Sequence, residues 1–130
     1  MKRLIALTPI LAALAACVTP AAPPVDAAFD PSATEFTGWV RVNRGEFQLF
    51  QVQRDLDNTP SPARCVSGAL PRNMQETARE LSGSKVTFTG RAAPWSDRGT
   101  SPTLQHEGSL ILNLCGGDHV IEAQSVRVLR

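Results

Sequence analysis

Residues 109–129 read SLILNLCGGDHVIEAQSVRVL, and their pattern predicts two strands joined by a turn. Its first part has leucine at every second position, which predicts a β-strand with the leucines along one face. These leucines are Leu110, Leu112 and Leu114. The glycine-containing segment 115–118 predicts a turn, and His119 to Leu129 predicts the last strand.

Upstream segments have the same strand character. Lys85 to Ala92 (KVTFTGRA) alternates apolar and polar residues, and Phe36 to Val42 and Glu46 to Gln53 are rich in aromatic and β-branched residues. The short link Asn43-Arg44-Gly45 between the last two predicts a β-hairpin. The apolar residues of 46–53 change phase, so we expect a bulge there or burial on both faces of that strand.

One helix interrupts the strands. Residues 71–82 (PRNMQETARELS) place Met74, Ala78 and Leu81 at helical spacing, and Gly83 stands where a left-handed cap is expected. Its apolar stripe is expected to close the barrel core. With a short strand at 65–70 and polar loops at 54–63 and 96–108, the expected order is β-β-β-α-β-β-β.

This order resembles the oligonucleotide/oligosaccharide-binding (OB) barrel, in which a helix follows the third strand. The segments KVTFTGRAAPW and SLILNLCGGDHVIEAQSVRVL are similar to paired strands of small bacterial OB domains, and Gly38 and Gly90 stand where such strands coil. The fold class expected is mainly β, a small OB-like barrel of about six strands with one α-helix. An SH3-like barrel and an α+β open sheet are the alternatives.

The N-terminus has the layout of an export signal. Met1-Lys2-Arg3 precedes an apolar run from Leu4 to Ala16 that is too short to cross a bilayer as a stable helix. The closing residues Leu14-Ala15-Ala16-Cys17 resemble a bacterial lipobox. The resemblance implies a signal peptide at 1–16, cleavage before Cys17, and a lipid anchor on that cysteine. The alternative is an ordinary cleaved signal in which Cys17 is incidental.

In enterobacterial lipoproteins, Asp directly after the lipidated cysteine favours retention in the inner membrane. Here Val18 occupies that position, so we expect the protein to be located in the outer membrane. Residues 17–34, with their many prolines and alanines, are expected to form a disordered tether reaching up to ~50 Å. Residues 35–130 are expected to form one OB-like domain.

Removal of Lys2 and Arg3 with the signal leaves 11 basic and 12 acidic side chains, a net charge of −1. A near-neutral protein lacks the basic patch that nucleic acid requires, so we expect no nucleic-acid partner.

Two further cysteines, Cys65 and Cys115, remain once Cys17 carries lipid. In an oxidising compartment a disulfide between them is the default. Unpaired buried thiols are one alternative. A metal or thiol site with His106 and His119 is another, although no close ligand pair supports it and both histidines are expected to be exposed.

Candidate binding residues lie where the strand after the helix ends and a loop begins. Arg91, Trp95 and Arg98 there, with Trp39 from the first strand, could form part of a ligand surface. Core packing is the alternative for the aromatic residues. A hydrolase triad of Ser67, His119 and Asp118 lacks the GxSxG nucleophile elbow.

The sequence therefore predicts a cell-envelope lipoprotein that acts as a non-catalytic binding or structural module, with an envelope protein or peptidoglycan as partner. No catalytic residue, metal or cofactor is expected. A small-ligand, glycan or polyanion sensor is the first alternative, and an uncharacterised hydrolase is the second.

Overall fold

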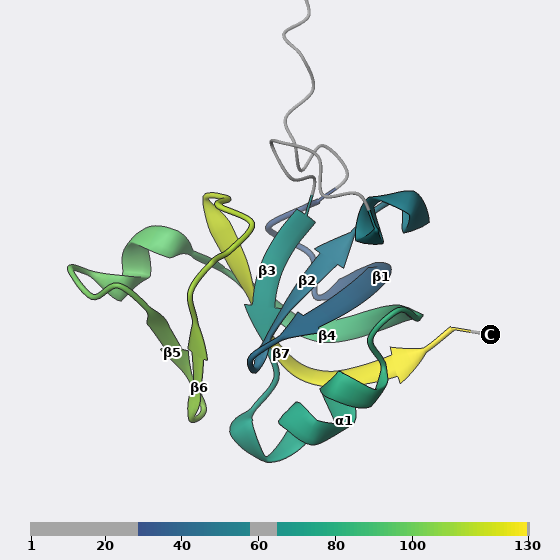
Figure 1. Ribbon diagram of the computed structural model, residues 1–130. Coiled ribbons are helices and arrows are strands. Elements are labelled where there is room, and N and C mark those ends of the chain that lie inside the picture. Colours follow the sequence, from purple (N-terminus) through teal and green to yellow (C-terminus); the bar gives the residue numbers. More distant parts are fainter. Residues whose placement is uncertain (1–28, 58–64, 130) are drawn as a thin grey trace, which may run out of the picture.

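The computed structural model describes residues 29–57 and 65–129 (Figure 1). The predicted signal at 1–16, the lipidation site Cys17 and the predicted tether up to residue 28 lie outside the described residues. Residues 58–64, which include the end of the polar loop predicted over 54–63, also lie outside them. Across the two described ranges, no helix has the length and apolar character to span a membrane.

The described chain forms strands with one short α-helix and three 3-10 helices. In chain order the elements are β1 (Glu35–Asn43), β2 (Glu46–Phe50), η1 (Gln53–Leu56), β3 (Cys65–Ala69), η2 (Arg72–Met74), α1 (Gln75–Glu80), β4 (Lys85–Pro94), η3 (Trp95–Arg98), β5 (Leu104–His106), β6 (Ser109–Ile111) and β7 (His119–Val128).

Five of the strands close into a barrel in the order β1-β2-β3-β7-β4. β1 closes it by pairing with both β2 and β4. The β3–β7 pair is parallel, the other barrel pairs are antiparallel, and α1 lies between β3 and β4 in sequence. The predicted mainly β, OB-like barrel is confirmed. β5 and β6 form a separate hairpin inserted between β4 and β7.

Several predicted elements differ from those observed. The strand expected over 46–53 ends at Phe50 and is followed by η1. The strand expected over 110–114 ends at Ile111, and Leu112 and Leu114 lie in the loop after it. The helix expected over 71–82 is shorter, because residues 72–74 form a 3-10 turn and only Gln75–Glu80 is α-helical. The loop expected over 96–108 contains η3 and β5. β5 has only three residues, too few for an alternating pattern, and its strand character comes from pairing with β6.

The barrel core is built from the inward side chains of all five strands. The rings of Phe47 and Phe88 stack at its centre with centroids 3.8 Å apart. Ala78 is buried in this core, and Met74 and Leu81 pack against it, so α1 covers the barrel as predicted. A smaller apolar cluster lies under the hairpin, consisting of Ala69, Ala93, Leu104, Ile111 and Val120.

Two glycines occupy positions that other residues would strain. Gly83 follows α1 with φ +94°, the left-handed conformation expected of a cap, and its amide donates to Val40 O of β1 at 2.7 Å. At Gly90 the β4–β7 register shifts, and a Cβ there would lie 2.2 Å from Glu122 O. The absence of a side chain lets β4 coil closely against β7.

The chain enters the barrel through a short ordered segment. Phe29 stacks on Phe36 with centroids 5.4 Å apart, and its ring centroid lies 6.3 Å from that of His119. Asp30 accepts hydrogen bonds from the hydroxyl and the amide of Ser32, and these lower the pKa of its carboxyl below the usual value. The described chain therefore starts beside the first residue of β7.

Candidate functional site

The outer face of β2 and β3 is where OB domains commonly bind their ligands. In this protein that face is covered, since every residue of β2 and β3 is buried. Phe47 and Leu49 belong to the barrel core. Glu46 and Gln48 alternate with them and are also buried, so β2 is covered on both faces. This confirms one of the two outcomes expected from its change of phase.

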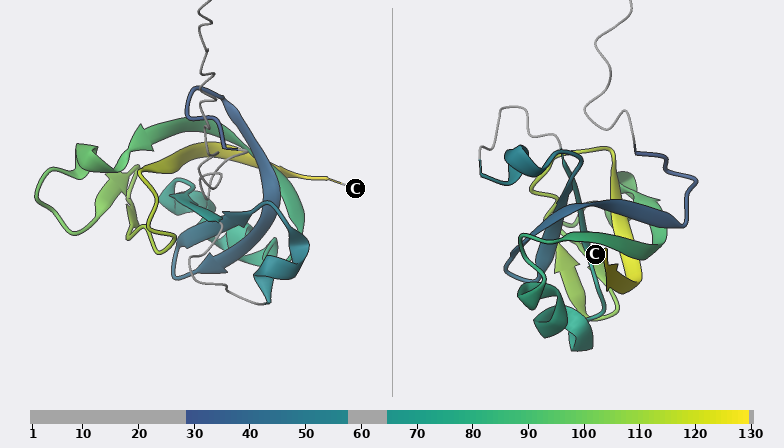
Figure 2. Two further views of the ribbon diagram at one scale, coloured as in Figure 1. Left: turned by 90° about the horizontal axis from the view of Figure 1, so that it is seen from above. Right: turned by 90° about the vertical axis from the view of Figure 1, so that its right-hand side faces the viewer.

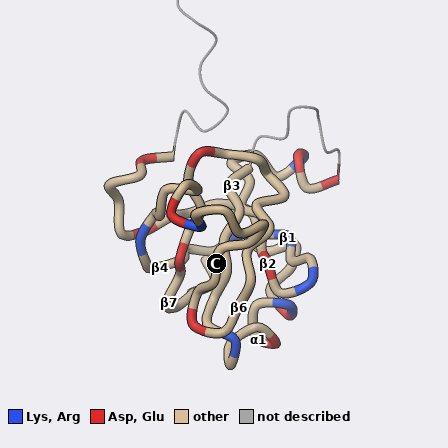
Figure 3. Tube along the Cα trace, turned by 90° about the vertical axis from the view of Figure 1, so that its left-hand side faces the viewer, with Lys and Arg blue, Asp and Glu red and all other residues tan. Residues whose placement is uncertain are grey.

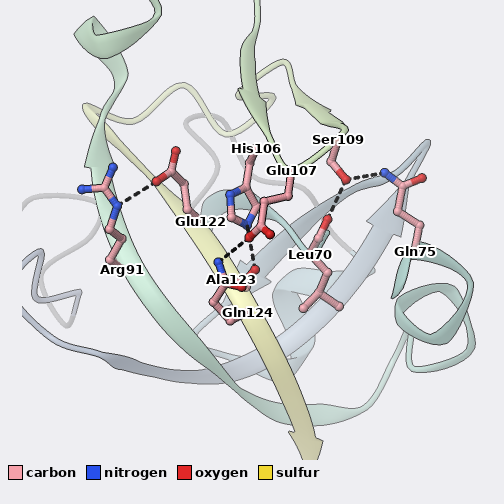
Figure 4. A network of polar contacts seen from close by, with 9 residues as sticks. All are labelled: Leu70, Gln75, Arg91, His106, Glu107, Ser109, Glu122, Ala123 and Gln124. Atoms are coloured by element: carbon pink, nitrogen blue, oxygen red, sulfur yellow. Dashed lines mark hydrogen bonds and ion pairs between the residues drawn. The ribbon is translucent and has the colours of Figure 1, made fainter. Parts of the chain in front are cut away.

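The cover consists of the β5–β6 hairpin and the loop that leads from it to β7. Figures 1 and 2 show this hairpin at the side of the barrel, next to β3. Ser109 Oγ donates to Leu70 O and accepts from Gln75 Nε2, both at 2.6 Å (Figure 4). These bonds attach the start of β6 to the end of β3 and to the helix.

His106 attaches the other strand of the hairpin. Its side chain is buried, and Nε2 lies 2.7 Å from Ala123 O of β7. The expectation that His106 is exposed was wrong, because the loop assigned to it contains β5 and turns this ring under the hairpin. Glu107 and Gln124 add an exposed side-chain hydrogen bond beside it (Figure 4).

Glu46, which lies on β2 under the covering loop, holds the part of the loop that follows β6. This side chain is only 1% exposed. Its Oε1 accepts the amides of Leu112 at 2.6 Å and Asn113 at 2.9 Å, and its Oε2 accepts the amide of Leu114 at 2.8 Å. Gln48 Nε2 adds a fourth bond to Oε2 at 3.1 Å. One buried acidic side chain thus binds three successive backbone amides, which fixes the path of the loop.

Cys115, the next residue along the loop, is held both by a hydrogen bond and by a disulfide. Cys115 donates its amide to Ser67 Oγ at 2.9 Å, and its side chain forms a disulfide with Cys65 across a Cα–Cα distance of 5.5 Å. The predicted disulfide is confirmed. The hairpin and its loop are therefore attached to β2 and β3 by hydrogen bonds and by a covalent bond.

The outer side of this cover is apolar. Leu110, Leu112 and Leu114 are 51%, 48% and 53% exposed, whereas the intervening Ile111 and Asn113 are buried. We call these three leucines the leucine row. The alternation predicted from the sequence is present, and the leucines are its solvent-facing half.

The predicted ligand residues are only partly brought together. Arg98 stacks over the Trp95 ring at 4.5 Å, and Arg91 pairs with Glu122 at 2.8 Å (Figure 4). Arg98 and Glu122 border a hollow of about 390 Å³. Trp39 is distant from them, because it pairs with Lys85, six residues before Arg91 along β4, or roughly 20 Å of strand.

The residues considered for catalysis have structural roles. Ser67 is fully buried, and its hydroxyl accepts the Cys115 amide, so it is not available as a nucleophile. His119 begins β7 beside the Phe29 ring. Within residues 29–57 and 65–129, no three His, Cys, Asp or Glu side chains are grouped to hold a metal ion.

Sequence reasoning did not identify Glu46 as a site residue. The available signal was a charged residue in a strand that is otherwise rich in large apolar side chains. Its partners lie 66 to 68 residues further along the chain, so no local pattern connects them.

Comparison of the chain with protein-family models, with curated proteins and with solved structures finds no match. The geometry itself defines the class: an OB-like barrel whose common ligand face is covered by its own hairpin and which presents an apolar row on that cover.

Proposed function

We propose that this chain is a cell-envelope lipoprotein whose OB-like domain is a non-catalytic binding or structural module. The observation that carries this proposal is the leucine row on a firmly attached cover. Leucines exposed in a row are unfavourable in water, and an apolar contact would remove that cost. Ser67, considered for catalysis, is used to hold the cover.

The location in the envelope rests on the N-terminal sequence. Leu14-Ala15-Ala16-Cys17 after a basic start and an apolar run supports cleavage before Cys17 and acylation of that residue, and Val18 supports the outer membrane. Two or more acyl chains give stable anchoring, since each buried methylene contributes about 0.8 kcal/mol and a single chain is marginal.

Expression of the full chain in a bacterium with the lipoprotein pathway tests this. The mature protein should have an N-terminal Cys17 with the mass of its acyl groups, and it should stay with membranes in high salt and leave them in detergent. Cys17→Ala should release a folded protein. Retention of Cys17→Ala in the membrane fraction would contradict the anchor.

A small-ligand, glycan or polyanion sensor is the second candidate. Arg98 supports it, because its Nε is buried with no hydrogen-bond partner in the described chain and the residue borders the hollow next to Glu122. Titration of Trp95 fluorescence with glycans and with inorganic phosphate tests it. The absence of any saturable change, in a protein whose Trp95→Ala variant stays folded, would exclude this candidate.

A further inference from the structure

Five successive backbone amides under the leucine row are paired within the protein. The amides of Leu112, Asn113 and Leu114 bind Glu46, and those of Cys115 and Gly116 bind Ser67 Oγ and Asn113 O. In an ordinary exposed loop, water would satisfy these groups. An unsatisfied amide in hydrocarbon is strongly unfavourable, so internal pairing suits a loop that enters an apolar medium.

The same segment carries no charge. Residues 108–117 read GSLILNLCGG, and Cys115 within them is in the disulfide. Figure 3 shows β6 without acidic or basic residues on the face that contains the hairpin. No residue of this segment would lose the hydration of an ionised group if the segment entered the boundary between lipid head groups and acyl chains, and the exposed acidic residues Glu107 and Asp118 stand at its two ends.

The size of the row argues against a freely diffusing protein partner or a second copy. Three half-exposed leucines offer far less apolar surface than the roughly 800 Å² that a stable interface buries on each partner. The row would favour a docked state by about 30-fold to 1000-fold, equivalent to about 2–4 kcal/mol at 1.4 kcal/mol per factor of ten. So small a docking free energy is sufficient only if the surface is tethered close to the leucine row, where its effective concentration is high.

The proposed lipid anchor supplies such a surface, and the inference rests on it. Eleven residues separate Cys17, which carries the lipid, from Phe29, and this stretch of chain spans at most about 40 Å. Phe29 lies beside His119, the residue that follows the covering loop. The anchored chain therefore reaches the domain at the end of the loop that carries Leu112 and Leu114.

We infer that the leucine row docks on the phospholipid bilayer that holds the anchor. Leu110, Leu112 and Leu114 enter the boundary between head groups and acyl chains, and Glu46 and the disulfide hold the loop in the shape that presents them. The domain then rests on the membrane in one orientation.

Fluorescence quenching of the full acylated chain tests this inference. Leu112→Trp places an indole in the row, and Leu129→Trp places one at another exposed apolar position, at the end of β7. Vesicles of phosphatidylethanolamine and phosphatidylglycerol with brominated acyl chains should quench the Leu112→Trp protein well beyond the background of Trp39 and Trp95. The Leu129→Trp protein should stay at that background. Equal quenching of the two variants would overturn the inference.

Two further experiments test whether the leucines themselves cause the quenching. Adding Leu110→Ser and Leu114→Ser to the Leu112→Trp protein should lower its quenching to the Leu129→Trp level. A change from 50 mM to 500 mM salt should leave the quenching unchanged, because the row is uncharged. Loss of quenching in high salt, or a photoreactive residue at 112 that crosslinks in cells to one protein in place of lipid, would also overturn it.

Failure of the anchor and failure of the docking are distinguishable. The anchor is judged by the mass of the mature N-terminus and by the release of Cys17→Ala. The docking is judged by the contrast between Leu112→Trp and Leu129→Trp in the same vesicles. An acylated protein without this contrast refutes the docking alone.

Discussion

Glu46 offers the most direct test of how the covering loop is held. Glu46→Ala removes the acceptor of three backbone amides and of Gln48 Nε2. Each buried donor left without a partner costs about 1–3 kcal/mol, and water can reach some of them once the loop loosens. We expect a loss of about 3–5 kcal/mol in the free energy of unfolding, a large part of the stability of a domain this size.

Glu46→Gln should be milder for a reason visible in the structure. Its amide oxygen can still accept two of the backbone amides, while its NH₂ group meets donors. Gln48 Oε1 is buried without a partner, so Gln48 can rotate and accept from the new NH₂. One backbone amide then remains unpaired, and we expect a loss of about 1–3 kcal/mol.

The matched control is Glu80→Gln, the same change at an exposed position of α1, with an expected effect within about 0.5 kcal/mol. Guanidinium unfolding followed by tryptophan fluorescence measures all three variants, in a chain without the leader and with Cys17→Ala. Hydrogen exchange of the amides of residues 112–114 should quicken in Glu46→Ala. A Glu46→Ala protein within about 1 kcal/mol of the control would refute the role of this carboxylate.

Two other predictions concern stability. Replacing Cys65 and Cys115 together by Ala should lower the free energy of unfolding by about 4 kcal/mol, because the disulfide closes a 50-residue separation; unfolding with and without reductant measures this, and a difference below about 1 kcal/mol would contradict it. Gly90→Ala should cost about 1–3 kcal/mol, because the added Cβ would lie 2.2 Å from Glu122 O. Its control, Gly117→Ala, meets nothing closer than 3.6 Å and should be near neutral, so equal melting temperatures for these two variants would count against the close β4–β7 contact.

Much of the barrel could be predicted because its signals are local. Apolar and polar residues alternate over 85–92 in β4, β7 follows a glycine-containing turn, and the helix is marked by Met74, Ala78 and Leu81 with Gly83 behind it. β5 was missed because three residues in a polar segment give no period, and the position of His106 was wrong for the same reason. These elements exist because of their pairing partners.

The candidate site divides in a similar way. Cys65 and Cys115 could be paired from the sequence, because they are the two cysteines that remain after Cys17. Arg98 contacts Trp95, and Arg91 pairs with Glu122, which borders the same hollow as Arg98, but Trp39 belongs to a distant part of β1. Proximity in the sequence predicted that Arg91, Trp95 and Arg98 lie in one region. Only the strand register showed that Trp39 does not belong to it.

Local sequence patterns were sufficient to predict the five barrel strands, a helix after the third strand, the disulfide partners and the alternation of leucines over 110–114. That the leucines face outward and that Glu46 lies beneath them follows from long-range packing. Alternation divides a strand into two faces, but which face is buried depends on what packs against it. Here the Glu46 carboxylate of β2 binds the backbone amides of the loop, and Cys65 of β3 forms a disulfide with Cys115. These bonds hold the inner side of the loop against the barrel, so the leucines face the solvent.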